Sequence, residues 1–438
     1  SLNPAVLRMR SERIWGIWAL ISEWPVLPFS EVAEMITDGA HESPPSVLTG
    51  GVPMASVKDM QERKISVEAC RRISTQDANR LEKLDCIPQK GDLLIAKDGS
   101  ILKHIIVFDQ PERIVLLSSI ALIRFNDSVD PYFAKCYLED PRIMDFFIGG
   151  YTGGSAIPRF VLKEFKKFPI HVPPLDVQRF IVRNIKSLDD AMTKNDLKSN
   201  CISELINSQF RSWFIDFDPV KAKAEGKLPY WMDEETAALF PDTFVDSELG
   251  LIPAGWKVKS LLEVSNLYDN LRVPLSSMER NERKGNYPYH GATSVMDYVD
   301  DFIFDGVHLL IAEDGSVLNE DGCPVLQYVW GKFWVNNHAH VLQGKDDFTT
   351  EHLHQYLKHF YIQPFVTGAV QLKINQKALH NVKLVIAPPN INNAFNKIIQ
   401  SLYRSIRENK MKNEILTLTR DALLPRLMSG ELKVPMEA

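Results

Sequence analysis

One stretch in the second half of the chain carries residue types found in metal-dependent nucleases. Glu313 and Asp314 follow an apolar run, and His338 and His340 alternate farther along. Carboxylate oxygens and imidazole nitrogens are ordinary ligands of divalent metals. Alternating histidines on a strand are more often structural, however, and the first half of the chain has no such cluster. The sequence therefore predicts no metal site, and a metal-dependent nuclease is kept only as a less favoured alternative.

Other catalytic patterns are missing as well. The double prolines at 173–174 and 388–389 lack both the Asn or Asp before them and the aromatic residue after them that an amino-methyltransferase would need. The helix predicted over 351–360 holds three histidines, but no two are four residues apart, as zinc binding on one helix face requires. We find no catalytic residues and expect a protein that is not an enzyme.

Repeated loops point to binding instead. A Leu-Leu-Ile-Ala strand occurs at 93–96 and again at 309–312, each followed by a polar turn, and each half also has a Thr-Gly loop. Loops on a rigid scaffold are where recognition concentrates. The first Thr-Gly loop lies in a glycine-rich stretch, 149–155, whose backbone freedom suggests a close approach to another segment or to a ligand.

Side chains near these loops suit the edges of DNA bases. Arg, Lys and Gln can hydrogen-bond to base edges in the major groove. We therefore predict DNA contacts in both halves, from Lys97, Asp98, Gly99, Ser100, Gly153, Gly154, Ser155, Ile157 and Arg159 in the first, and from Glu313, Gly315, Ser316, Gly368, Gln371 and Lys373 in the second.

Two long helical segments must position these loops. Residues 152–174 align without a gap on 367–389, and a long amphipathic run follows each double proline. Apolar residues recur in alternating steps of four and three, the pattern of a coiled-coil seam. Two ordinary amphipathic helices, each packed on its own domain, are the alternative, but the seams share one polar interruption. Antiparallel pairing would bring the polar residues of the two interruptions together in one layer that fixes the register of the helices. This layer would consist of Asn195, Ser199, Asn409 and Asn413.

Composition narrows the class of protein further. The chain has 438 residues, a net charge of −6 and five cysteines that form no Cys-x-x-Cys pair. These features favour a cytoplasmic protein without disulfides. No apolar run is long enough to span a membrane. Because neither half is basic, DNA binding would depend on a few local cations or on a partner.

At this point the chain resembles the specificity subunits of type I restriction-modification systems. Four segments carry the resemblance, at residues 173–181, 210–219, 287–292 and 424–432. The resemblance adds Tyr289 and His290 to the predicted DNA contacts. The start of the second helix departs from the pattern, because Asn390-Ile391-Asn392-Asn393 lacks an equivalent of Gln178. The resemblance therefore does not imply that both helix starts contact their partners equally.

The resemblance implies a function and a set of partners. Each of two target-recognition domains would read half of a split sequence in double-stranded DNA, and the helices would fix the gap. Two modification subunits, which methylate adenine with S-adenosylmethionine, would dock on this chain, and restriction subunits driven by ATP and Mg²⁺ would join them. The chain itself would bind no cofactor. The main competing hypothesis is a protein-interaction scaffold that does not read DNA.

These inferences define the expected domain plan. The fold class is α+β, with two similar α/β target-recognition domains separated by a pair of long antiparallel coiled-coil helices in a pseudo-twofold repeat. The expected boundaries are 1–22 for an N-terminal extension, 23–173 for the first recognition domain, 174–217 for the first spacer helix, 218–252 for a linker, 253–388 for the second recognition domain, 389–429 for the second spacer helix and 430–438 for a tail.

Overall fold

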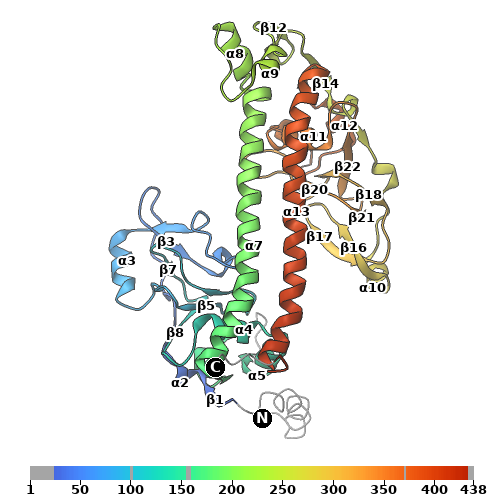
Figure 1. Cartoon of the computed structure of the whole chain (residues 1–438). Coiled ribbons are helices and arrows are strands. Elements are labelled where there is room, and N and C mark those ends of the chain that lie inside the picture. Colours follow the sequence, from blue (N-terminus) through green and yellow to red (C-terminus); the bar gives the residue numbers. More distant parts are fainter. Residues whose placement is uncertain (1–23, 99–101, 154–158, 369–370, 433–438) are drawn as a thin grey trace. The chain divides into compact units, whose positions relative to one another are not determined.

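The computed structural model describes residues 24–98, 102–153, 159–368 and 371–432. The chain divides into two compact units, the first formed by residues 1–194 and 412–438 and the second by residues 195–411. Each unit mixes strands with helices, and the two long helices α7 (Leu175–Phe210) and α13 (Pro389–Met428) contribute a part to both units (Figure 1). The predicted α+β class is confirmed. Among the described helices, none is long and apolar enough to cross a membrane.

The first unit is built on two small sheets. The larger has the antiparallel order β2-β8-β5-β6, and in the smaller, β4-β3-β7, strands β3 and β7 are parallel. A further antiparallel pair joins β1 to β11. The strands are β1 (Val26–Pro28), β2 (Ala33–Asp38), β3 (Val52–Ala55), β4 (Arg71–Ile73), β5 (Leu93–Ala96), β6 (Ile105–Val107), β7 (Val115–Leu116), β8 (Ile120–Phe125) and β11 (Pro169–His171). The expected Leu-Leu-Ile-Ala strand is β5, and all four of its residues are buried.

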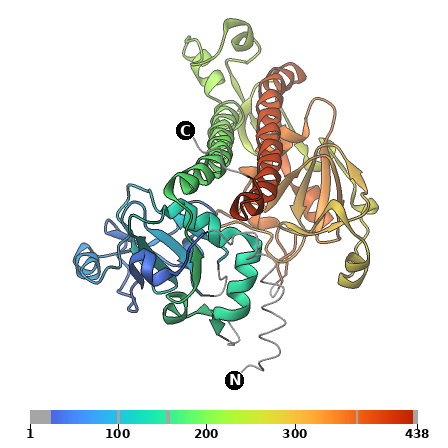
Figure 2. The same cartoon turned by 60° about the horizontal axis from the view of Figure 1, so that its bottom comes forward.

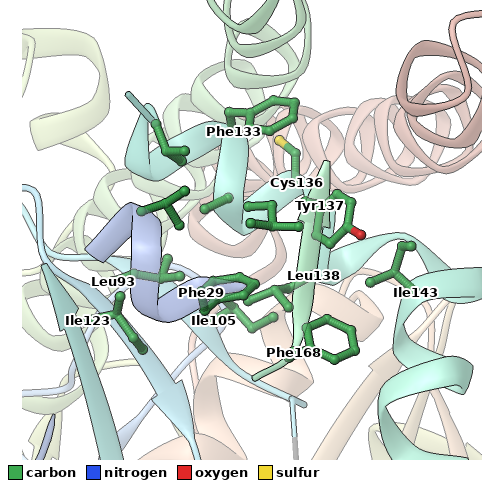
Figure 3. Close-up of a cluster of buried hydrophobic side chains, with 14 of the residues drawn as sticks. Phe29, Leu93, Ile105, Ile123, Phe133, Cys136, Tyr137, Leu138, Ile143 and Phe168 are labelled. Carbon is green, nitrogen blue, oxygen red and sulfur yellow. The ribbon is translucent and has the colours of Figure 1, made fainter. Parts of the chain in front are cut away.

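Helices cover the larger sheet of this unit. The pattern over 131–147, which predicts one helix, forms two: α4 (Pro131–Glu139) and α5 (Pro141–Tyr151). The break lies at Asp140, which is extended (ψ 121°) as expected for a residue before proline. Figure 3 shows Phe133 and Tyr137 of α4 in the buried cluster that also holds Phe29, Phe168 and the strand residue Leu93. The remaining helices are α2 (Phe29–Val32), α3 (Thr75–Glu82) and α6 (Leu162–Phe165).

The glycine-rich stretch differs from its prediction at the two glycines inside α5. A Cβ atom added at Gly149 or Gly150 would meet nothing within 4 Å. No other described segment therefore approaches these two positions closely, and an approach to a ligand stays a prediction. After α5, the short strand β9 (Thr152–Gly153) pairs with β10 (Arg159–Phe160).

Within the first unit, the start of α7 runs antiparallel to the end of α13 (Figures 1 and 2). Ile181 and Ile185 share one buried cluster with Leu424 and Leu427. Farther along α7, Asp189 forms an ion pair of 3.4 Å with Arg420. As residue numbers rise along α7 they fall along α13, and the seam residues point inward.

The second unit repeats the strand order of the first. Its antiparallel sheet is β15-β22-β19-β20, and in its other sheet, β17-β16-β21-β18, strands β16 and β21 are parallel, like β3 and β7. The pair β14–β23 corresponds to β1–β11. The strands are β14 (Lys257–Ser260), β15 (Ser265–Leu267), β16 (Lys284–His290), β17 (Val295–Val299), β18 (Phe304–Asp305), β19 (His308–Ala312), β20 (Leu326–Val329), β21 (Lys332–Val335), β22 (Ala339–Gly344) and β23 (Lys383–Ile386).

The segment expected as a linker is itself folded within the second unit. After α7 and a π-helical turn (Arg211–Ile215) come α8 (Asp218–Ala224), α9 (Glu234–Ala238) and a hairpin of β12 (Phe244–Ser247) and β13 (Gly250–Pro253). Val220, Phe240 and Ile252 from this segment are buried together with Trp213 and Trp256. The other helices of this unit are α10 (Ser277–Glu282), α11 (Thr350–Lys358) and α12 (Gln376–Asn381).

The parts of the long helices in the second unit also pair antiparallel. Near the end of α7 the ring of Phe210 lies 6.0 Å from that of Phe395, near the start of α13. Farther back along α7, Asn409 of α13 donates a hydrogen bond of 3.2 Å from Nδ2 to Ser199 Oγ.

Candidate nucleic-acid interface

Two loops predicted to recognise DNA meet in the second unit. The turn after β19 donates from the backbone N–H of Gly315 to the carbonyl of Leu372 (3.1 Å), and the N–H of Ile374 donates to the carbonyl of Glu313 (2.9 Å). Lys373 Nζ lies 3.9 Å from Asp314 Oδ2. The structure therefore brings the strand-end turn and the Thr-Gly loop into one surface.

A glycine is required in the second of these loops. Gly368 has a positive φ of +94°, and a Cβ added there would lie 2.1 Å from the carbonyl oxygen of Gln371. Gly368, Gln371 and Lys373 are exposed, as are Gly315 and Ser316 of the neighbouring turn. These five predicted residues are accessible to a ligand.

The surface beside the two loops is hollowed. A cavity of about 320 Å³ is lined by Gly291, Ala292, Thr293, Ser294, Met296, Asp314, Asn336 and His338. His338 Nδ1 lies 2.9 Å from both carboxylate oxygens of Asp314. The predicted DNA-contact set omits Asp314, Asn336 and His338, although the sequence presents Asp314 and His338 as residue types that can bind metals. Their spacing could have suggested the site, because the end of β19 and the start of β22 must meet if these strands pair.

Beneath this turn lies a buried ionic cluster. His340 Nδ1 is 2.6 Å from Asp269 Oδ2, and Arg272 Nη1 donates to Glu313 Oε2 (2.7 Å). Burial lowers the pKa of His340, but its hydrogen bond to the Asp269 carboxylate and that ionic attraction raise the pKa above its ordinary value overall. Burial raises the pKa of Asp269, whereas His340 and Gln376 lower it, with a net decrease. Glu313 is thus tied to a cation and is not free to contact a base.

The geometry of this cluster opposes metal binding. Ligand atoms of Asp269, Glu313 and His340 lie within 4.8 Å of one another. However, the Arg272 guanidinium already contacts both carboxylates. The second ring nitrogen of His340 lies 2.7 Å from the carbonyl oxygen of Ile374. A metal ion would have to displace a buried guanidinium and break these bonds, so we interpret the cluster as a support for the turn.

The first unit has a corresponding support of different composition. Lys97, which follows β5 as Glu313 follows β19, forms an ion pair with Asp38. His41 Nε2 contacts the same carboxylate at 3.0 Å. Because the Lys97 side chain is only 12% exposed, its assignment as a base contact is corrected to a support of the turn. The backbone N–H of Phe160 donates to the Lys97 carbonyl (3.4 Å), as Ile374 does to Glu313.

The other predicted contacts of the first unit are less defined. Asp98 is half-buried, and Gly153 pairs with Arg159 in the short hairpin of β9 and β10. The remaining predicted residues lie outside the described residues, namely Gly99, Ser100, Gly154, Ser155 and Ile157.

Two residues predicted from the resemblance are buried in the second unit. Tyr289 and His290 are 1% and 7% exposed. The Tyr289 hydroxyl accepts a hydrogen bond from the backbone N–H of Leu275 (2.9 Å), and His290 Nδ1 lies 3.0 Å from Gln327 Oε1. Burial lowers the pKa of His290, with partial compensation from Gln327. Their assignment as DNA contacts is corrected, because both side chains pack inside the unit.

The start of each long helix is held by a buried amide. Gln178 donates to the carbonyls of Pro173 (2.8 Å) and Ser128 (2.9 Å), and accepts from the N–H of Asp130 (2.8 Å). Asn392 likewise donates to the carbonyl five residues before it, at Ala387 (3.1 Å), and to the Asp347 carboxylate.

The expected absence of a Gln178 equivalent is therefore wrong. Asn392 makes the same local bond in the second unit, and a shorter amide is sufficient there. Both side chains are fully buried, so neither amide contacts a partner from this position. The difference at this position gives no reason to expect unequal partner contacts.

The four residues expected in a polar layer lie near the helix seams. In the second unit Asn409 is buried and donates to Ser199 Oγ, whose hydroxyl donates to the carbonyl of Asn195 (2.9 Å). In the first unit Asn413 donates from Nδ2 to the carbonyl of Met192 (3.3 Å). Ser199, Asn195 and Asn413 are half-buried. Their role in fixing register stays a prediction.

Comparison with known proteins agrees with this architecture. A type I restriction enzyme specificity subunit named MjaIX, from Methanocaldococcus jannaschii, is 23% identical over 94% of each chain. A Haemophilus influenzae relative that carries the name type I restriction enzyme specificity subunit S.HindORF215P is 36% identical over 160 residues. These residues span 36% of this chain and 40% of that relative. The crystal structure of an S subunit from M. genitalium covers 92% of this chain and 96% of its own, with a TM-score of 0.53 and 15% identity, which indicates a shared fold.

A family model matches both repeated parts of the chain. The model for the type I restriction modification DNA specificity domain matches residues 21–200 and 253–417. Each match covers one recognition domain and part of a long helix. The chain therefore belongs to the family of type I restriction-modification DNA specificity proteins and carries two copies of the family domain.

Proposed function

We propose that this chain is the sequence-reading subunit of a type I restriction-modification complex, with one half of a split DNA site read by each unit. The observation that carries the proposal is the repeated construction of one loop pair. In both units the turn after the Leu-Leu-Ile-Ala strand, β5 or β19, is hydrogen-bonded to a Thr-Gly hairpin, while the side chains on these loops differ. One scaffold with two different surfaces suits the recognition of two different half-sites.

The long helices set the gap between the half-sites in this proposal. Helix α7 is continuous over 36 residues, which corresponds to ~54 Å. A rod of this length corresponds to roughly 16 base pairs at 3.4 Å per step. Such a length suits a two-part site with an unread centre.

Exposed apolar side chains on these helices would bind the partner subunits. Leu197 and Leu205 on α7, in the second unit, are 60% and 55% exposed, and Ile415 and Leu418 on α13, in the first unit, are 63% and 70% exposed. Apolar side chains that a helix leaves exposed are available to be buried against another protein. We assign these two faces to two modification subunits, and restriction subunits would join that complex.

Catalysis and cofactors would belong to the partners. In our proposal this chain is not an enzyme and binds no cofactor, S-adenosylmethionine is bound by the modification subunits, and ATP with Mg²⁺ by the restriction subunits. All five cysteines are free thiols, three of them buried, which supports a cytoplasmic location for the complex.

Exchange of one recognition domain tests the proposal. We would replace residues 23–173 by the equivalent segment of a relative, co-express the chimera with its modification subunits and map methylated adenines in the host genome. We expect one half-site to change while the other half-site and the gap persist. A change in both half-sites would refute the assignment of one half-site to each unit.

A binding assay separates this proposal from a scaffold that does not read DNA. Gel-shift experiments would compare the chain alone with the chain bound to its modification subunits, on DNA with and without the mapped site. The proposal expects tight, sequence-specific binding mainly in the presence of the partner, which supplies most of the phosphate neutralisation. Equal affinity for both DNAs in the complex would favour the scaffold.

A further inference from the structure

We propose that His338, oriented by Asp314, is a specificity-determining residue that reads a base with an exocyclic amino group, adenine or cytosine, in the half-site of the second unit. The inference rests on the proposed DNA-reading function. It concerns the cavity beside the strand-end turn, which is lined by residues 291–294, Met296, Asp314, Asn336 and His338.

The carboxylate fixes the hydrogen-bonding character of the imidazole. Both oxygens of Asp314 lie 2.9 Å from His338 Nδ1. A carboxylate only accepts hydrogen bonds, so Nδ1 carries a proton, and an imidazole whose single proton is there presents Nε2 as an acceptor. Within the described part of the chain Nε2 has no hydrogen-bond partner, and the side chain is 47% exposed. An acceptor at this edge matches the amino groups N6 of adenine and N4 of cytosine.

The backbone around His338 is held on both sides. Its N–H donates to Asn336 Oδ1 (2.8 Å), and its carbonyl accepts from the N–H of Glu313 (2.8 Å). Asn336 is itself buried at 4% exposure, and its N–H donates to the carbonyl of His290. An imidazole on such a rigid support loses little freedom when it binds, as a recognition group requires.

The charge at the cavity favours a base over a phosphate. The carboxylate of Asp314 faces the hollow and would repel a phosphate at this distance. Lys373, 3.9 Å from the same carboxylate and 53% exposed, lies at its edge and could contact the backbone instead. Gly291 and Ala292 add little bulk to the lining. The arrangement therefore suits the planar edge of a base, with the cation beside it.

The test uses the chain assembled with its modification subunits. Duplexes with a randomised half-site would be methylated and sequenced to give the preference at each position. For His338→Ala we expect discrimination at one position of one half-site to fall roughly 2- to 12-fold, the range for loss of one hydrogen bond. The other half-site should be unchanged. The effect should fall on a single base pair, and whether that pair is A·T or G·C in the wild-type motif tells adenine from cytosine.

A second variant tests the role of Asp314 as a positioning residue. The amide of Asp314→Asn can donate to Nδ1 and move the ring proton to Nε2. Preference should then shift toward a base with an acceptor, guanine or thymine. The matched control is His380→Ala, an exposed histidine on α12 of the same unit, which should leave the motif intact.

The outcomes distinguish this inference from the proposed function. An unchanged motif for His338→Ala, or a uniform loss of methylation at every position, would overturn the inference and leave two-part recognition standing. A wild-type complex that methylates no two-part motif would instead overturn the proposed function. Thermal melting of each variant would confirm that the unit stays folded, as expected for a half-exposed side chain.

Discussion

The turn after the Leu-Leu-Ile-Ala strand is held by a lysine in the first unit and by a glutamate in the second. Lys97 pairs with Asp38, at the end of β2, whereas Glu313 pairs with Arg272, just after β15. Asp38 and Asp269 occupy matching places in the two sheets. Asp38 pairs with Ala121 on β8, and Asp269 is hydrogen-bonded to His340 on β22, the strand that corresponds to β8. Both units thus have a carboxylate at this place, but its partners are Lys97 and His41 in the first unit and Arg272 and His340 in the second.

This difference shows which features the duplication keeps. The backbone bond from the hairpin to the turn is present in both units, at Phe160 to Lys97 and at Ile374 to Glu313. The side-chain ion pair beneath it has reversed polarity. Strand order and backbone pairing therefore define the scaffold, and a buried pair of either polarity supports the loop above it.

Removal of one partner from the ion pairs beneath the turns should have the largest effect, and a larger one in the second unit. Asp269→Ala removes the carboxylate nearest to His340 and leaves Arg272 paired with Glu313 alone, and breaking such a buried pair costs about 3–5 kcal/mol. Lys97→Met should cost less, about 1–3 kcal/mol, because His41 still contacts Asp38. Hydrogen exchange in urea, resolved by mass spectrometry, would report each unit separately. Equal losses would contradict the view that the second cluster is the more tightly coupled.

Truncation of the helix-start amides should have an intermediate effect. Gln178→Ala leaves two backbone carbonyls and one backbone N–H without their hydrogen-bond partner, and we expect the free energy of unfolding of the first unit to fall by about 3 kcal/mol. Asn392→Ala loses two donated bonds and should cost about 2 kcal/mol in the second. Urea unfolding of the two variants would be compared. If instead each variant is stable but fails to bind modification subunits, these amides are partner contacts and our correction is wrong.

Acid sensitivity should give the smallest difference between the units. Burial lowers the pKa of His352 to about 3, with slight compensation by Asn396, and burial lowers that of His171 in the first unit to about 4. A histidine kept neutral in the folded state stabilises it above the ordinary pKa of 6.5, and this stability is lost as pH falls toward the folded value. His340 acts in the opposite sense, since its raised pKa adds stability below 6.5 that is lost as pH rises.

Substitution of His352 isolates the pH-dependent contribution of this buried histidine to stability. His352 packs 4.3 Å from the ring of Phe348, so phenylalanine should fit. Relative to wild type, we expect His352→Phe to gain about 1.4 kcal/mol in unfolding free energy on going from pH 8 to pH 5.5. Chemical denaturation at both pH values measures the change. The same gain at both pH values would show that packing, not protonation, is responsible.

Local patterns in the sequence predict much of this fold. The Leu-Leu-Ile-Ala strands and the two seams follow from hydrophobic spacing that each segment carries alone, and the offset between the copies follows from the residues that the copies share. The sequence does not predict the role of Asp269, because its partner His340 is brought to it only by the pairing of β15 with β22. Tyr289 and His290 were misassigned for a related reason: a polar atom on an aromatic ring does not tell whether the neighbouring strands will bury it.

The most direct test of the account lengthens both helices together. Seven residues inserted after Lys194 in α7 and seven before Lys412 in α13 keep the heptad pattern on both sides and add ~10.5 Å. Methylated adenines would be mapped in cells that express this variant with its modification subunits. We expect both half-sites to be retained and the gap to grow by about three base pairs, at 3.4 Å per step. Altered half-sites at an unchanged gap would contradict the claim that the helices space the two readers.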